Sequence, residues 1–390
     1  MVTLSNRLRQ ISPGGEDGWD IFNRARALEA QGIPLTDLTV GEHDIRTHPT
    51  ILSAMAEAAH AGQTGYAATA GTADLRARIA ARVSERTQVP TTQDNVLVVP
   101  GAQMALFTAL MGALEPGDPV LIPDPYYATY PGTVRAAGGR PVALVTRPKD
   151  GFQPTRAALE AAGDARAVLV NSPNNPTGAV YGPETMHALA DAARDRDAWL
   201  ISDEVYDTQV WTGAHQSPRA LPHMADRTLV AGSLSKSHAM TGSRLGWLIG
   251  PADAIAEMAT LATYTTYGVP GYIQAAGCHA LSLGAAFEAE ISAPFLRRRQ
   301  ACLDRLDRQQ VVRAIPSGGA MYLMLDIRGA GLSAPDFAAR LLDQHRIAVM
   351  PGDSFGRAAA GHIRVALTLP ETRLLPAFDI ILSFAEEMRP

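Results

Sequence analysis

The 390-residue sequence has few cysteines, no long apolar run and no large excess of charge of either sign. Cys278 and Cys302 exclude a disulfide scaffold and lack the spacing of metal or redox motifs. No apolar run approaches the ~20 residues that cross a bilayer, and the first 18 residues have no apolar core of a signal peptide. The formal charge of −5 favours neither nucleic acid nor an anionic membrane. We therefore expect a cytoplasmic protein that binds neither.

Short apolar segments alternate with helical patterns through the middle of the chain. The segments rich in Val, Leu and Ile predict buried strands at 95–99, 119–122, 167–170, 199–202 and 228–231. The patterns between them predict helices at 102–114, 156–162 and 183–195. Such alternation indicates an α/β fold with a mostly parallel central sheet flanked by helices, and ligands of such sheets bind at the carboxyl ends of the strands.

The pattern changes after about residue 285. A long charged helical stretch is followed by short strands and helices, which indicates a smaller α+β unit. The expected elements are a strand at 320–325, a helix at 334–345, short strands at 347–350 and 362–366, and a final helix. We predict a large α/β domain over residues 49–285, and a small α+β domain formed by residues 1–48 and 286–390.

Lys236 lies in the segment Ser233-Leu-Ser-Lys-Ser-His-Ala-Met-Thr-Gly-Ser-Arg244. A lysine amine condenses with an aldehyde, while Ser233, Ser235 and Arg244 supply hydrogen-bond donors for a phosphate. Pyridoxal 5'-phosphate carries both groups. The alternative is a solvated lysine and a surface arginine joined by a Ser/Gly loop.

A second set of phosphate donors follows the strand at 95–99. Pro100-Gly-Ala-Gln103 stands between that strand and a helix, so the backbone N–H groups of Ala102 and Gln103 point at an anion. An ordinary strand-to-helix turn is the alternative.

The pyridine ring of this cofactor requires three further partners. Asp203, at the end of a buried strand, suits a protonated ring nitrogen, although it could instead cap a helix. Asn175 and the hydroxyl of Tyr206 suit the phenolic oxygen, although Asn-Pro-Thr-Gly is also good turn chemistry. Tyr127 is our choice for the ring face over its neighbours Tyr126 and Tyr130, any of which could be core.

An amino-acid substrate presents an α-carboxylate, which calls for a fixed arginine. Arg364 lies in the predicted strand Gly361-His-Ile-Arg-Val-Ala366, and its alternative is a strand arginine that reaches to solvent. A metal cluster could be drawn from Glu42, His43, Asp44 and His48. Their spacing is irregular, and we expect no metal site.

These motifs together resemble the class I/II, fold-type I pyridoxal-phosphate aminotransferases over almost the whole chain. The resemblance implies that Lys236 is the Schiff-base lysine, Asp203 the partner of the pyridinium and Arg364 the carboxylate clamp. Gly41 is similar to the glycine whose backbone contacts the substrate carboxylate. Tyr66 resembles the tyrosine that reaches the phosphate of the neighbouring subunit, which implies a homodimer with shared active sites.

Two departures from the family bear on the substrate. Gln103 stands where aspartate-type members often carry a lysine for the distal carboxylate, and Gly41-Glu-His-Asp-Ile45 replaces Gly-Glu-Pro-Asp-Phe. Both argue against strict aspartate specificity. The lysine segment is also similar to arginine–pyruvate aminotransferases.

The expected function is transfer of an amino group from an L-amino acid to pyruvate or 2-oxoglutarate by a ping-pong mechanism, with arginine, aspartate or another amino acid as donor. The first alternative is a β- or γ-lyase on the same scaffold, since elimination uses the same carbanion and the same residues. The second is a non-catalytic cofactor-binding regulator. That regulator needs a DNA-binding domain, and no basic helix-turn-helix pattern precedes Gly41.

Overall fold

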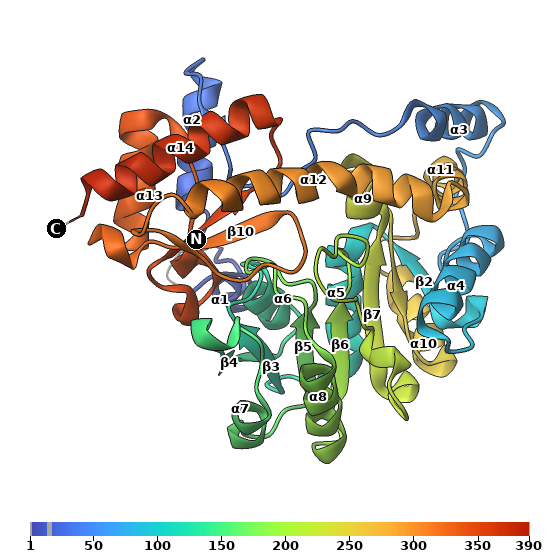
Figure 1. Ribbon diagram of the computed structural model, residues 1–390. Helices are drawn as coiled ribbons and strands as arrows, with labels where there is room; N and C mark the ends of the chain where they lie inside the picture. Colours follow the sequence, from blue (N-terminus) through green and yellow to red (C-terminus); the bar gives the residue numbers. More distant parts are fainter. Residues whose placement is uncertain (1, 14–17, 390) are drawn as a thin grey trace.

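The computed structural model describes residues 2–13 and 18–389, so parts of the predicted small domain (residues 1, 14–17 and 390) lie outside the described residues. A large sheet with helices on both faces forms one side of the molecule, and a smaller group of strands and helices forms the other (Figure 1). Helix α12 (Gly284–Leu306) runs across both groups.

The large sheet has seven strands in the order β2-β8-β7-β6-β5-β3-β4. Strand β8 is antiparallel to both of its neighbours, and the other adjacent pairs are parallel. The strands are β2 (Val96–Val99), β3 (Pro119–Asp124), β4 (Arg140–Val145), β5 (Ala167–Asn171), β6 (Trp199–Asp203), β7 (Thr228–Ser233) and β8 (Gly246–Ile249). Since β2, β5 and β8 are buried along their whole length, their runs of Val, Leu and Ile have no polar alternation.

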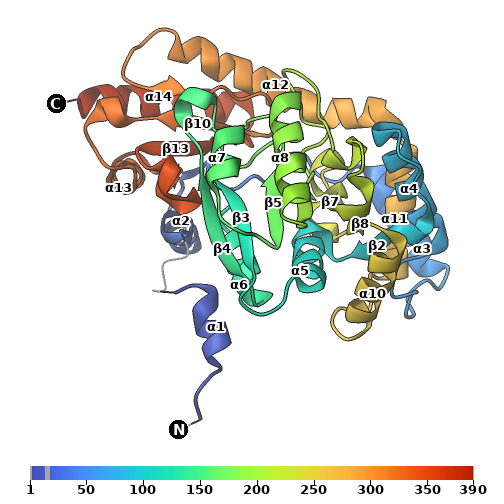
Figure 2. The same ribbon diagram turned by 90° about the horizontal axis from the view of Figure 1, so that it is seen from below.

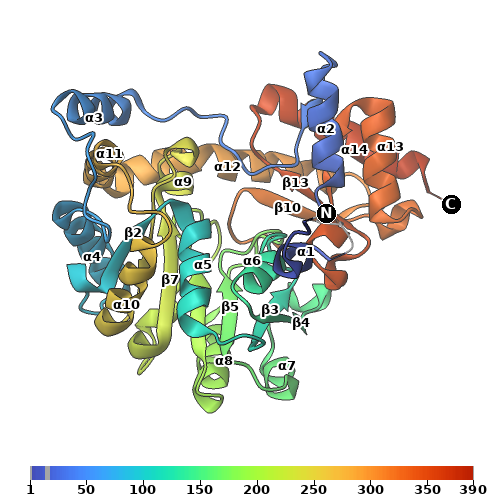
Figure 3. The same ribbon diagram turned by 180° about the vertical axis from the view of Figure 1, so that it is seen from behind.

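Helices cover both faces of this sheet. On the face turned to the viewer in Figure 3 lie α5 (Gly101–Ala113), α6 (Tyr130–Ala136) and α10 (Ala252–Thr263). On the other face, α7 (Arg156–Ala161) and α8 (Pro183–Asp195) share one apolar core. A further core on that face joins α3 (Pro49–His60), α4 (Ala73–Thr87) and α11 (Gly271–Ser282).

The smaller group combines the two ends of the chain. Its four-stranded sheet has the order β12-β13-β10-β9, and β1 pairs in parallel with β11. The strands are β1 (Thr36–Asp37), β9 (Arg313–Ala314), β10 (Tyr322–Asp326), β11 (Ile347–Ala348), β12 (Met350–Pro351) and β13 (His362–Ala366). Around them pack α2 (Asp20–Ala30), α13 (Ala334–His345) and α14 (Glu371–Glu387). Helix α1 (Asn6–Ile11) lies apart from this core, against α6 (Figure 2).

A group of partly buried charges ties α12 to the large sheet. Arg82 and Arg86 of α4 each pair with Asp207, which follows β6, and with Glu288 of α12. The Arg82–Asp207 and Arg86–Glu288 contacts are 3.2 and 2.6 Å long. Each charge is matched by opposite charges, so the network fixes α12 beside the carboxyl ends of the central strands.

The predicted fold class is confirmed, and so are the five predicted strands of the large sheet, with small shifts at their ends. Two strands of the large sheet were not predicted, and neither were the two-residue strands β1 and β9 of the smaller group. β4 is a partly exposed edge strand that begins with Arg-Pro, and β8 is short and follows the left-handed residue Arg244 (φ 47°). The domain boundaries near residues 48 and 285 stay a prediction. Within residues 2–13 and 18–389, no helix is both long and apolar enough to cross a membrane.

Candidate active site

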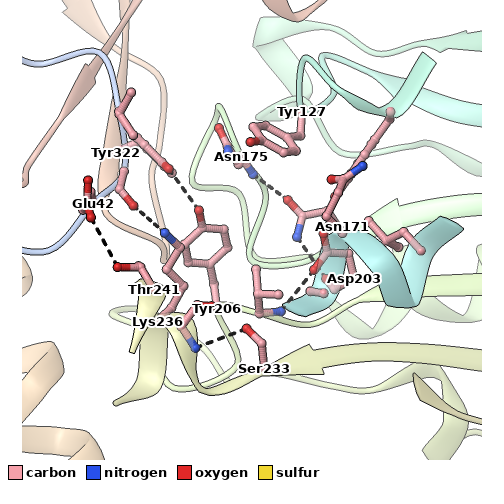
Figure 4. Close-up of a pocket in the computed structure, with 18 of the residues that line it drawn as sticks. Glu42, Tyr127, Asn171, Asn175, Asp203, Tyr206, Ser233, Lys236, Thr241 and Tyr322 are labelled. Atoms are coloured by element: carbon pink, nitrogen blue, oxygen red, sulfur yellow. Dashed lines mark hydrogen bonds between the residues drawn. The ribbon is translucent and has the colours of Figure 1, made fainter. Parts of the chain in front are cut away.

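A cavity of about 320 Å³ lies at the carboxyl ends of β5, β6 and β7, facing the smaller group of strands (Figure 4). It brings together every predicted site residue except Tyr66. The predicted residues that line it are Gly41, Ala102, Gln103, Tyr127, Asn175, Asp203, Tyr206, Ser233, Ser235, Lys236, Arg244 and Arg364.

Lys236 projects into this cavity from the short helix α9 (Leu234–Ser237), which Ser233 caps. Its Nζ donates a hydrogen bond to the backbone carbonyl of Gly41. Burial, together with the nearby guanidinium groups of Arg244 and Arg364, lowers the pKa of the amine from 10.5 to about 8. A large share of the amine is therefore neutral near pH 8, the form that acts as a nucleophile or a base.

Asp203 ends β6 and is buried, with 5% of its surface exposed. Its Oδ2 accepts a hydrogen bond from the hydroxyl of Tyr130 (2.7 Å), and its Oδ1 accepts one from the Val205 backbone N–H (3.2 Å). Burial raises the pKa of the carboxyl to about 6, although both hydrogen bonds oppose this. No cationic side chain of the described chain forms an ion pair with Asp203, so a cationic ligand atom would stabilise its charge.

Arg364, on β13, is the matching buried cation. Its guanidinium donates to Asn175 Oδ1 (2.7 Å) and to the carbonyl of Thr39, both neutral acceptors. It also lies over the rings of Tyr322 and Phe355, at 4.4 and 4.5 Å from their centroids. Its Nε is buried without a hydrogen-bond partner, and no carboxylate within residues 2–13 and 18–389 pairs with it. The cavity therefore offers this cation to an anionic ligand group.

A group of donors occupies the end of the cavity beside α5. Arg244 packs closely against Gly101, the first residue of that helix. A Cβ added to Gly101 would stand only 2.3 Å from Nη2 of Arg244. Gly101 also has a φ of +77°, so both its conformation and this close approach require glycine. Ser233 and Ser235 lie on the neighbouring strand end and helix α9. With the N–H groups of Ala102 and Gln103, they could hold a phosphate.

Three site residues were missed from the sequence: Asn171, Tyr130 and Tyr322. Asn171 lies beside Asp203 on the neighbouring strand, and its side chain donates to the backbone carbonyl of Asp203 (2.9 Å). It is a polar residue at the end of a buried strand, and this feature of the sequence could have identified it as a site residue. The hydroxyl of Tyr322, on β10, lies 3.0 Å from the hydroxyl of Tyr206, although the two residues are 116 positions apart in the sequence. No local pattern could predict that contact.

The choice among three neighbouring tyrosines is refined by their positions. Tyr127 and Tyr130 both line the cavity, but the hydroxyl of Tyr130 is engaged by Asp203, and Tyr126 lines a neighbouring cavity. The Tyr127 and Tyr130 rings meet edge to face, with centroids 5.7 Å apart. Burial raises the pKa of Tyr127 to about 12, so its ring stays uncharged. Tyr127 thus remains the predicted aromatic face.

Gly41 and Tyr66 lie differently with respect to the cavity. Gly41 lines it, and a Cβ there would stand 1.8 Å from the Tyr322 hydroxyl oxygen, so a side chain is excluded. Tyr66 is 91% exposed and its ring contacts Tyr267. This chain alone therefore does not bring Tyr66 to its own cavity.

The residues weighed as a metal cluster have other partners. Asp44 forms an ion pair with Arg298 (2.6 Å), His43 packs edge-on against Phe295, and His48 caps helix α3. Across the part of the chain that the structure describes, no group of three or more His, Cys, Asp or Glu side chains could hold a metal ion.

The residues present fit pyridoxal phosphate. A buried carboxylate without a cation suits the pyridinium nitrogen, a buried lysine with a lowered pKa suits the aldehyde, and the Arg244 end of the cavity suits the phosphate. The guanidinium of Arg364, which has only neutral partners in the described chain, remains for a substrate carboxylate.

Comparison with known proteins agrees with this geometry. Residues 33–381 match the family of class I and II aminotransferases. The chain is 40% identical to an arginine–pyruvate transaminase of Pseudomonas aeruginosa over 389 residues, 99% of each protein. It is 35% identical to an aspartate/prephenate aminotransferase of Thermus thermophilus, over 97% of this chain and 98% of that protein.

Solved structures show the same fold. The aspartate aminotransferase of Thermus thermophilus with maleate superposes with a TM-score of 0.92 at 34% identity, over 99% of this chain and 100% of that one. The aspartate aminotransferase of Thermotoga maritima gives a TM-score of 0.91 at 31% identity, over 98% and 100%. The chain belongs to the class I and II aminotransferases and is a pyridoxal-phosphate-dependent aminotransferase.

Proposed function

We propose that this enzyme transfers the amino group of a long, basic L-amino acid such as arginine to pyruvate or 2-oxoglutarate. The observation that carries the proposal is the pair of unneutralised buried charges, Asp203 and Arg364, that face one cavity together with Lys236. The choice of donor follows from Gln103, which cannot pair with a distal carboxylate by charge. The similarity to an arginine–pyruvate transaminase supports the same donor.

Each part of the cavity has a separate task in this proposal. Asp203, supported by Tyr130, holds the ring nitrogen protonated, and Asn175 and Tyr206 donate to the phenolic oxygen. Tyr127 covers the ring face. When bound, pyridoxal phosphate withdraws electrons from the substrate Cα and makes its proton acidic. The phosphate donors are Ser233, Ser235, Arg244 and the backbone N–H groups of Ala102 and Gln103.

Lys236 moves the proton. In its neutral form, Nζ would take the proton from the substrate Cα and, in the same half-reaction, would deliver it to the carbon that is the aldehyde carbon of free pyridoxal phosphate. The carbonyl of Gly41 accepts a hydrogen bond from this amine, which restricts where Nζ can lie. Because burial lowers the pKa to about 8, the amine can both accept and release a proton near neutral pH.

Arg364 orients the substrate by its α-carboxylate. The guanidinium already has two fixed acceptors in Asn175 and Thr39, so it is held rigid before substrate arrives. A rigid clamp reduces the entropy lost on binding and points the substrate Cα toward Lys236. Release of the 2-oxo acid before the second oxo acid binds gives ping-pong kinetics.

We further propose a cytoplasmic homodimer in which Tyr66 completes the phosphate site of the partner subunit. Its 91% exposure supports this, because an exposed tyrosine ring with its hydroxyl at the tip suits an interface. Two further tyrosine side chains, Tyr264 and Tyr267, are also exposed, with 83% and 53% of their surface accessible to solvent.

The donor is tested by a screen with pyruvate and 2-oxoglutarate as acceptors. We expect arginine to exceed aspartate in kcat/KM, because Gln103 offers no charge to a distal carboxylate. Lys236→Ala should lose nearly all turnover with every donor and also lose the visible absorbance of the lysine-bound cofactor. Full activity of Lys236→Ala, or a preference for aspartate, would contradict the proposal.

The pKa of Lys236 predicts how the cofactor-free protein recovers its cofactor. Only the neutral amine condenses with an aldehyde, so the recombination rate should rise about tenfold per pH unit below pH 8 and level off above it. Stopped-flow absorbance at several pH values measures this. Glu42→Gln should lower the pH at which the rate reaches half its maximum, because the Glu42 carboxylate raises the pKa of the amine. The exposed control Asp164→Asn should leave it in place. A rate that still rises toward pH 10.5 would show that the pKa of Lys236 is not lowered.

Tyr130→Phe tests the support of Asp203. The loss of a hydrogen bond to a charged group costs about 1.5–3 kcal/mol, so the carboxylate becomes easier to protonate. The acidic limb of the kcat profile should therefore move up by about one to two pH units, and kcat should fall about tenfold. Tyr126→Phe, which removes the hydroxyl of a neighbouring tyrosine that does not contact Asp203, is the matched control. An unchanged acidic limb in Tyr130→Phe would rule out this role.

A further inference from the structure

Asp124 is a buried carboxylate that the mechanism above does not use. It ends β3, has 2% of its surface exposed and is not part of the lining of the active-site cavity. Both of its oxygens accept from the loop that joins β12 to β13 (residues 352–361). Oδ2 accepts from the backbone N–H of Arg357 (3.0 Å), and Oδ1 accepts from the backbone N–H of Ala358 (3.1 Å). Burial raises the pKa of the carboxyl to about 6, although the two N–H groups and the charge of Arg357 oppose this.

The loop between β12 and β13 is fitted closely to this carboxylate. A Cβ added to Gly356 would stand 2.1 Å from Oδ1 of Asp124, and Gly356 has a φ of +114°. Both the close approach and the backbone conformation therefore require glycine. The backbone N–H of Tyr126 also donates to the carbonyl of Phe355 (2.9 Å). Three hydrogen bonds from backbone N–H groups thus hold the loop to the end of β3.

The same loop carries an aromatic ring that contacts Arg364. Phe355 is fully buried, and the guanidinium of Arg364 lies 4.5 Å from the centroid of its ring. The hydrogen bonds to Asn175 and Thr39 hold the edge of the guanidinium, whereas the rings of Phe355 and Tyr322 hold its plane. The position of the loop therefore bears on the orientation of this cation.

We propose that Asp124 is a positioning residue for the substrate carboxylate: it holds Phe355 against Arg364 and so fixes the guanidinium before substrate binds. This inference rests on the proposed function, in which Arg364 receives the carboxylate of the amino acid and of the 2-oxo acid. Tyr127, three residues after Asp124, lines the active-site cavity (Figure 4). The end of β3 thus joins the predicted aromatic face of the cofactor to the support of the carboxylate clamp.

Asp124→Asn tests this role in the holoenzyme. The amide keeps one oxygen, and its NH2 group faces one of the two loop N–H groups, so that N–H loses its acceptor and the loop is released. Stopped-flow absorbance measures each half-reaction separately, with L-arginine or L-alanine in one direction and pyruvate or 2-oxoglutarate in the other. We expect the concentration that gives half the limiting rate to rise about tenfold for all four, because each carries a carboxylate. The limiting rate should change by less than about twofold, since Lys236 is untouched.

Two further variants separate this role from general packing. Thr146→Val is the matched control, because the Thr146 hydroxyl donates to the backbone carbonyl of Asp124 (2.6 Å) and not to the loop. It should leave the half-saturating concentrations unchanged. Phe355→Leu keeps an apolar side chain but removes the ring, and it should reproduce the effect of Asp124→Asn. Combining these two substitutions should add little to the larger single effect, because both act through one contact with Arg364.

Gly356→Ala provides an independent test, including the case in which Asp124→Asn does not fold. Its Cβ would push the loop away from an intact carboxylate, so the same rise in half-saturating concentration is expected. The absorbance of the bound cofactor should stay unchanged, which shows that the cofactor site is intact.

Three outcomes would overturn the proposal. Unchanged half-saturating concentrations in Asp124→Asn and Gly356→Ala would show that the loop does not support the clamp. An equal rise in Thr146→Val would assign the effect to packing at the end of β3. Fully additive effects of Asp124→Asn and Phe355→Leu would show that the two residues act separately. Failure of the proposed function is distinct, since Arg364→Lys would then leave the half-saturating concentrations unchanged.

Discussion

A buried carboxylate and a buried guanidinium face the same cavity, and in the described parts of the chain neither meets an oppositely charged side chain. An isolated charge inside a protein is costly, and it persists only where a ligand or a set of hydrogen bonds compensates it. Asp203 has a tyrosine hydroxyl and a backbone N–H, and Arg364 has an amide and a backbone carbonyl. The remaining compensation is left to the ring nitrogen of the cofactor and the carboxylate of the substrate.

The rest of the fold serves to hold these two charges in place. Asp203 ends a central parallel strand, and Arg364 comes from the smaller sheet, so the cavity exists only where the two groups of strands meet. Arg82, Arg86, Asp207 and Glu288 fix the long helix α12 to the loop that follows Asp203. Lys236 then lies near two carboxylates and two guanidinium groups, and burial together with these charges sets its pKa. A change in the packing of α12 would therefore alter the chemistry of the site.

The residues of the site could be predicted from the sequence where local pattern and chemistry coincide. Lys236, Asp203 and Asn175 follow buried strands and carry groups that the cofactor needs, so their place in one cavity was predictable. Tyr130 and Tyr322 could not be found in this way, because their partners are 73 and 116 residues distant in the chain. The strand β8 was missed because it begins with Gly246 and only its last two residues, Leu248 and Ile249, form an aliphatic run.

We conclude that this site, whose residues could also serve elimination, carries out amino transfer. This conclusion is tested most directly by mixing the holoenzyme with an excess of one amino acid and no 2-oxo acid acceptor, and measuring the oxo acid released per active site. We expect one equivalent of 2-oxo acid per site, with no further release until pyruvate or 2-oxoglutarate is added. Continued release of product without an acceptor would contradict it and indicate a lyase.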